Sequence, residues 1–197
     1  MKYIATLAVL LMLAACGEKA GQPKTETTGT AQSVQQTGTA TATTTASTGG
    51  TSSALSPDDK EFVSKAGMGG LAEVQMGNLA LSKASHANVK AFGQRMVIDH
   101  SKANDELAQL ATAKGVALPT ELDADHKAVF DHLTSLSGAE FDKAYMQHMV
   151  SDHVEDVDEF EKASTTAGDS DLRAWAGKTL PTLKEHLQHA QTVSGKI

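Results

Sequence analysis

Four polar side chains lie on the apolar faces of predicted helices, where a buried charge or imidazole is costly unless it has a partner. They are Glu73, His100, His153 and His186. One carboxylate and three imidazoles are ligands that zinc, iron and copper accept, and helical bundles build such sites from facing side chains. The sequence therefore predicts a transition-metal site at these four residues, with zinc, iron or copper as the cofactor.

The positions of these residues along their helices favour convergence. Glu73 precedes the predicted turn between the first two helices by twelve residues, and His100 follows that turn by fifteen. At a rise of ~1.5 Å per residue, an antiparallel pair brings the two within roughly 5 Å of one level. His153 and His186 are placed in the same way, fifteen residues before and eighteen after the next break. All four are expected near the middle of their helices.

Other polar residues are candidates to orient these ligands. Asp99 and Asp152 each precede an inner histidine, and Asp142 and Tyr145 are further candidates, although Asp142 also suits a cap. The alternative is a buried network without metal, in which the histidines bond Glu73, Tyr145 or the backbone.

The remaining histidines and the inner methionines have other expected roles. His148 is a weaker candidate ligand, while four more histidines are expected on the surface: His86, His126, His132 and His189. Three methionines face inward, where core packing is expected, although their thioethers are also soft copper ligands: Met76, Met96 and Met149.

Several enzyme classes and nucleic-acid binding lack their sequence signals here. There is no zinc-protease pair of histidines around a glutamate, no Gly-x-Ser-x-Gly elbow and no dinucleotide fingerprint. No Glu-x-x-His pair is present, so the usual di-iron constellation is incomplete. The net charge of −7 has no basic stripe, which argues against a nucleic-acid partner.

The elements that must position the four residues are long amphipathic helices. Capping residues, Gly and Pro breaks and apolar periodicity predict helices over 57–83, 86–114, 138–166 and 170–193, with a short helix within 121–136. Ser85 is the expected cap of the second helix. No segment has strand periodicity, so the predicted fold is all-α, a four-helix bundle with a short crossover helix.

The chain before this domain has two further segments. Residues 1–15 have the short apolar core of an export signal, and Leu13-Ala14-Ala15-Cys16 resembles the bacterial lipobox, in which the cysteine receives lipid. Residues 16–55 are rich in Thr, Ser, Gly and Ala and are expected to form a flexible tether to the bundle at 56–197. Gly17, rather than aspartate, follows the cysteine, and resemblance to lipoprotein sorting favours the outer membrane.

The domain resembles a known bacterial family. The segments "GLAEVQMGNLALSKASHANVKAFGQRMVIDHSKANDEL", "LSGAEFDKAYMQHMVSDHVEDVDEFEKAS" and "LRAWAGKTLPTLKEHLQHAQ" resemble domain of unknown function 4142 over nearly all of 56–193. The Asp99-His100 pair and the spacing of Phe141-Asp142, Tyr145 and His153 carry the resemblance best. It implies a ferritin-like, exported domain and no established activity.

The preferred interpretation is a lipid-anchored outer-membrane protein facing the periplasm, with a ferritin-like bundle that binds metal for homeostasis or stress protection in the envelope. Two alternatives are a metal-free interaction module, whose histidines only specify the core, and a metal-dependent enzyme. The membrane, through the lipid on Cys16, is the only partner that the sequence predicts.

Overall fold

The computed structural model describes residues 54–197 as five helices, with no strand among those residues. Predictions for the signal at 1–15, for Cys16 and for nearly all of the tether at 16–55 therefore lie outside the described residues. The helices are α1 (Pro57–Lys83), α2 (Ala87–Ala113), α3 (Ala124–Ser135), α4 (Gly138–Thr166) and α5 (Ser170–Ser194). None of the described helices is long and apolar enough to cross a membrane. The predicted all-α, ferritin-like bundle with a short crossover helix is confirmed.

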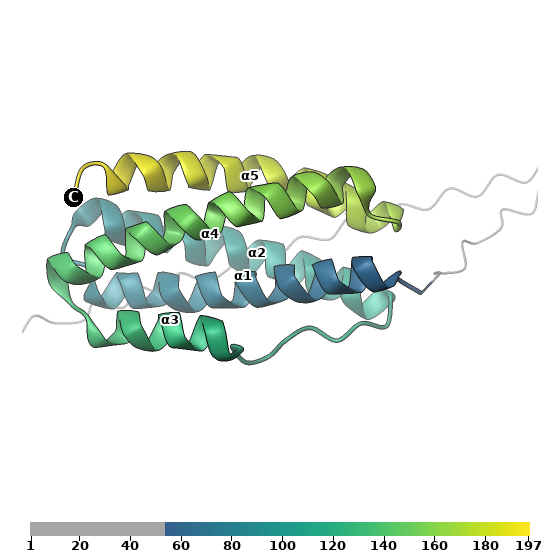
Figure 1. Ribbon diagram of the computed structural model, residues 1–197, viewed down its shortest axis with the longest axis horizontal. Coiled ribbons are helices and arrows are strands. Elements are labelled where there is room, and N and C mark those ends of the chain that lie inside the picture. Colours follow the sequence, from purple (N-terminus) through teal and green to yellow (C-terminus); the bar gives the residue numbers. More distant parts are fainter. Residues whose placement is uncertain (1–53) are drawn as a thin grey trace, which may run out of the picture. The chain divides into compact units, whose positions relative to one another are not determined.

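The four long helices form two antiparallel hairpins that lie side by side (Figure 1). α1 packs most extensively on α2, and α4 packs most extensively on α5. After α2 the chain returns along the bundle, and α3 lies beside α1 within that return (Figure 1). This crossover starts α4 at the end of the bundle where α2 also starts, so α2 and α4 run in the same direction.

Local capping chemistry sets the helix starts. The Ser56 side chain accepts a hydrogen bond from the Asp59 amide at 3.1 Å, as its position before Pro57 predicts. The prediction that Ser85 caps α2 is wrong by one residue, because His86 is the cap and its Nδ1 accepts from the Asn88 amide at 3.2 Å.

Two buried aspartates join the hairpins at opposite ends of the bundle. Asp142, on α4, accepts hydrogen bonds from the amides of Ser85 at 3.0 Å and His86 at 2.9 Å, in the α1–α2 turn. Asp59, on α1, accepts from the amides of Gly168 at 2.9 Å and Asp169 at 3.1 Å, in the α4–α5 turn. Each hairpin thus satisfies the turn of the other, which aligns the two hairpins along their length.

The apolar core consists of two clusters separated by a polar layer. One cluster contains Met76, Phe92, Met96, Phe141 and Met149, and the other contains Val63, Leu107, Phe160, Trp175 and Leu183. On α2, α4 and α5, the residue between the two clusters is a buried histidine: His100, His153 and His186. Bundle cores are ordinarily filled with apolar side chains, so this layer is the first place to look for function.

Glycines allow α1 and α2 to approach closely beside this layer. A Cβ atom on Gly93 would lie 2.7 Å from the Ala80 Cβ and 3.0 Å from the Gly77 carbonyl oxygen. Neither neighbour can rotate away, so this spacing of the helices requires the absence of a side chain at Gly93.

Candidate metal centre

Glu73 connects the two hairpins inside the polar layer. Its side chain is 1 % exposed, and its Oε2 lies 2.7 Å from the Nδ1 of His100 on the neighbouring helix α2. Its Oε1 lies 3.3 Å from the Nε2 of His153 on α4, but without hydrogen-bond geometry, so neither atom has a hydrogen-bond partner among the described residues. Burial, and then the nearby charge of Asp152, raise the pKa of Glu73 well above its usual value.

The three histidines of the layer surround a common space. Their ring centroids are separated by 5.2 Å for His100 and His186, 5.4 Å for His153 and His186, and 5.7 Å for His100 and His153. Each ring offers one nitrogen such that the three nitrogens all lie within 4.8 Å of one another. Tetrahedral coordination at the usual zinc–nitrogen distance holds ligand nitrogens about 3.3 Å apart, so small side-chain movements would close the site.

One nitrogen of each ring is held by a neighbouring oxygen. His153 Nδ1 donates to the Met149 carbonyl oxygen at 2.9 Å, and the carbonyl requires that this nitrogen carry the proton. His186 Nε2 lies 2.8 Å from Asp99 Oδ2, and His100 Nδ1 pairs with Glu73 as described above. Within the described part of the chain, the opposite nitrogens have no hydrogen-bond partner: His100 Nε2, His153 Nε2 and His186 Nδ1.

The protonation of these rings suits ligation. Burial lowers the pKa of His100 to about 4, of His153 to about 3 and of His186 to about 4. The rings are therefore neutral at neutral pH. Because His153 and His186 donate through the held nitrogen, the opposite nitrogen of each carries a lone pair that a metal ion can accept.

Asp99 lies against a histidine of the layer, but its partner is His186 rather than the adjacent His100. The Asp99 carboxylate also accepts from Arg95 Nε at 3.2 Å, and Arg95 Nη2 lies 2.7 Å from Glu185. Partial burial opposes ionisation of Asp99, but the hydrogen bonds from His186 and Arg95 outweigh it and lower its pKa. An ionised Asp99 holds His186 in the tautomer that leaves Nδ1 free.

Asp156 belongs to the same region, and the sequence reasoning missed it. It forms a second group with Glu73 and His153, in which one ligand atom from each lies within 4.8 Å of the others. Burial, and then the charge of Glu73, raise the pKa of Asp156 well above its usual value. The sequence spacing does indicate this placement, because Asp156 follows His153 by three residues and so shares its helix face.

The other three predicted orienting residues do not bond the histidines. Asp142 precedes His153 by eleven residues, about 16 Å along α4, and joins the hairpin turn instead. The Tyr145 ring stacks on Phe141 with centroids 5.5 Å apart, and its buried hydroxyl has no hydrogen-bond partner in the described part of the chain. Asp152 forms no hydrogen bond or ion pair with any residue of 54–197, and its pKa is raised, chiefly by burial.

Two expectations for the other histidines and methionines can be compared with the structure. His189 is half-buried rather than fully exposed, because its ring packs edge-on against Phe92 at 5.4 Å and its buried Nδ1 has no partner among residues 54–197. Met76, Met96 and Met149 lie in an apolar cluster, as expected for core residues.

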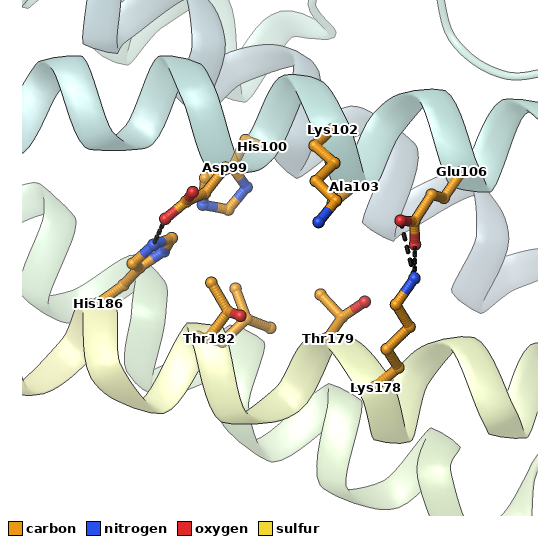
Figure 2. A pocket seen from close by; sticks show the side chains of 10 residues that line it. Asp99, His100, Lys102, Ala103, Glu106, Lys178, Thr179, Thr182 and His186 are labelled. Atoms are coloured by element: carbon orange, nitrogen blue, oxygen red, sulfur yellow. Dashed lines mark hydrogen bonds and ion pairs between the residues drawn. The ribbon is translucent and has the colours of Figure 1, made fainter.

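Two cavities adjoin the layer. A small one of about 20 Å³ is lined by Glu73, His100, Asn104, Asp156 and Trp175 among others. A larger one of about 100 Å³ opens between α2 and α5, with His100 and His186 in its wall (Figure 2). The polar layer is therefore within reach of ions and small molecules from the surface.

The fold has a counterpart among solved structures, and the sequence belongs to a known family. The crystal structure of a DUF305 fragment from Deinococcus radiodurans superposes with a TM-score of 0.65 at 11 % identity, covering 73 % of this chain and 99 % of that one. At this identity the likeness concerns the fold alone. No curated protein is significantly similar to the chain. The sequence model of the domain of unknown function DUF4142 matches residues 40–193, and the chain therefore belongs to the DUF4142 family.

Proposed function

We propose that the bundle binds one divalent transition-metal ion through His100 Nε2, His153 Nε2 and His186 Nδ1. The observation that carries this proposal is the set of three buried imidazole nitrogens without hydrogen-bond partners among residues 54–197, whose opposite ring nitrogens are each held by a neighbouring oxygen. Glu73 orients His100 through Oε2, and its unpartnered Oε1 is available as a further ligand.

The energetics favour a bound cation over a metal-free hydrogen-bond network. A network that merely specifies a core satisfies its members, whereas each unsatisfied buried polar atom costs about 1–3 kcal/mol. A cation at the three nitrogens would satisfy all of them and would lower the pKa of Glu73 toward its ordinary value. Three imidazoles with a carboxylate suit zinc, iron or copper.

The cellular part of the proposal comes from the N-terminal sequence. The predicted export signal at 1–15, the lipobox-like run before Cys16 and the low-complexity segment at 16–55 support a lipoprotein of the outer membrane whose bundle faces the periplasm. We propose that it takes part in metal homeostasis or stress protection of the cell envelope. The family carries no activity that would narrow this role.

The test compares metal-loaded and metal-free protein. Full-length protein purified without a histidine tag is analysed for bound metal, and its melting is followed with added metal and with chelator. Metal at a hundredfold its dissociation constant stabilises the folded state by about 2.7 kcal/mol. The variants His100→Ala and His153→Ala should lose this stabilisation. Their melting temperatures should therefore fall further below that of wild type with metal than with chelator.

His132→Ala is the matched control, because His132 is exposed on α3 and outside the polar layer. It should melt like wild type under both conditions. The metal-free interaction module would be favoured if the protein retains no metal and each of these two variants, His100→Ala and His153→Ala, loses the same melting temperature with and without chelator.

A further inference from the structure

The larger cavity gives the proposed metal a side open to the surface. It holds about 100 Å³ between α2 and α5, and one water molecule needs only about 10–15 Å³ of such space. His100 and His186 lie toward one end of it, and the ion pair of Glu106 with Lys178 closes the other (Figure 2). There is room for a ligand of several heavy atoms beside the two rings.

The unpartnered nitrogens belong to the rings in this wall. His100 is 6 % exposed and His186 is 1 % exposed, so both rings are buried although they border the cavity. A metal bound to His100 Nε2 and His186 Nδ1 would lie at the inner end of the cavity. A ligand that entered between α2 and α5 would meet the rings of His100 and His186, whose unpartnered nitrogens lie just beneath the cavity wall.

The charged groups along the cavity differ in whether they are already paired. Both oxygens of Glu106 lie 2.8 Å from Lys178 Nζ, so these two charges compensate each other. Asp99 is held by Arg95 and His186. Lys102 extends from α2 into the space between the helices (Figure 2), and its ammonium has no ion-pair partner among residues 54–197.

The two threonine hydroxyls in the cavity wall also differ in whether they already have a hydrogen-bond partner. Thr179 donates to the Trp175 carbonyl oxygen at 2.9 Å. The Thr182 hydroxyl makes no hydrogen bond within the described part of the chain, and its side chain lies on α5 opposite α2 (Figure 2). The cavity thus offers one uncommitted ammonium and one uncommitted hydroxyl, which together suit an anion with oxygen acceptors.

We propose that a small oxyanion, of the size of formate or bicarbonate, enters this cavity and binds the metal at a remaining coordination position. One oxygen of the anion ligates the metal beside His100 and His186, while Lys102 and Thr182 bind the outer oxygen. This inference rests on the proposed metal binding and adds an exogenous ligand to it. It distinguishes an open metal site from a closed structural one.

The experiment uses full-length protein loaded with Co²⁺, whose visible absorption reports its coordination. Sodium formate is titrated at constant ionic strength kept with sodium perchlorate. Saturable change in the Co²⁺ spectrum is expected. Lys102→Met should weaken the apparent formate affinity about fivefold, the upper range for an exposed charge pair, and should leave the Co²⁺ affinity unchanged.

Lys178→Met is the matched control, because it removes the same charge from the other end of the cavity, beside Glu106 rather than beside the rings. Its formate affinity should fall less than that of Lys102→Met. Thr182→Val, which removes only the hydroxyl from a side chain of nearly the same shape, should weaken formate binding in the same direction as Lys102→Met.

The outcomes separate the two proposals. Failure of Co²⁺ to bind would overturn the metal site and this inference with it. Co²⁺ binding with a spectrum that formate does not change would overturn this inference alone. Equal weakening by Lys102→Met and Lys178→Met would overturn the assignment of Lys102, because it would reflect only the net charge of the surface.

Discussion

The close approach of α1 and α2 predicts that Gly93→Ala destabilises the bundle, against the ordinary helix preference for alanine. The new Cβ would lie 2.7 Å from the Ala80 Cβ and 3.0 Å from the Gly77 carbonyl oxygen. Ordinary van der Waals contact begins near 3.4 Å, so the helices must separate locally by about 0.7 Å. Such overpacking costs about 1–3 kcal/mol.

The gain in helix propensity on replacing glycine with alanine offsets about 1 kcal/mol of this cost. Because both contacting groups are rigid, we expect a net loss of about 1–2 kcal/mol. For a domain of this size, that corresponds to a fall of about 3–7 °C in melting temperature. The assay is thermal and urea unfolding followed by circular dichroism at 222 nm, with chelator present so that metal linkage does not contribute.

Gly177→Ala provides the matched control. Gly177 is an exposed glycine of α5, and an added Cβ would make only an ordinary contact of 3.7 Å with the Ser164 Cβ. It should therefore gain about 0.5–1 kcal/mol from helix propensity alone. If Gly93→Ala proved as stable as wild type or more so, the proposed helix spacing would be refuted. Gly93→Ala should also weaken metal binding, because separating α1 from α2 lengthens the contact of Glu73 with His100.

Two other predictions concern the ends of the chain and of the bundle. Asp142→Ala should lower the free energy of unfolding, measured in urea, by about 2 kcal/mol, because the amides of the α1–α2 turn lose a charged acceptor. The control Asp131→Ala, at an exposed position, should change this free energy by less than about 0.5 kcal/mol. Similar losses for the two variants would contradict the role of Asp142 in joining the hairpins. Cys16→Ala should abolish incorporation of labelled palmitate and release the protein from the membrane fraction, whereas continued labelling would show that the lipid is attached elsewhere.

The sequence predicts the helices and the inward polar residues well because both depend on local rules. Ser56 before Pro57 sets a helix start wherever the helix packs, and the positions of Glu73 and His100 on their helix faces follow from the 3.6-residue period. That Glu73 and His100 lie at nearly the same level along the bundle follows from counting residues on either side of a tight turn. These properties need no knowledge of how one hairpin packs on the other.

These local rules do not predict which partner each side chain contacts. Asp99 was expected to assist an inner histidine, but its pairing with His186, 87 residues away, depends on how α2 and α5 are rotated about their axes. Asp142 was a candidate for the same role and instead serves a turn of the opposite hairpin, because the crossover through α3 starts α4 beside that turn. The sequence places His189 on the surface, because residues at the edge of a packed helix face and residues on its exposed face follow the same sequence pattern.

By itself, the sequence determined the all-α class, the four polar positions and the family to which the chain belongs. The tertiary structure decided which imidazole nitrogens are held and which are free, because that choice depends on acceptors from other turns and helices: Glu73, Asp99 and the Met149 carbonyl. It also decided that α1 and α2 meet at Gly93 and that a cavity between α2 and α5 borders His100 and His186. The physical reason is that secondary structure is set by short-range backbone and capping preferences, whereas the register and rotation of packed helices depend on contacts between residues far apart in the chain.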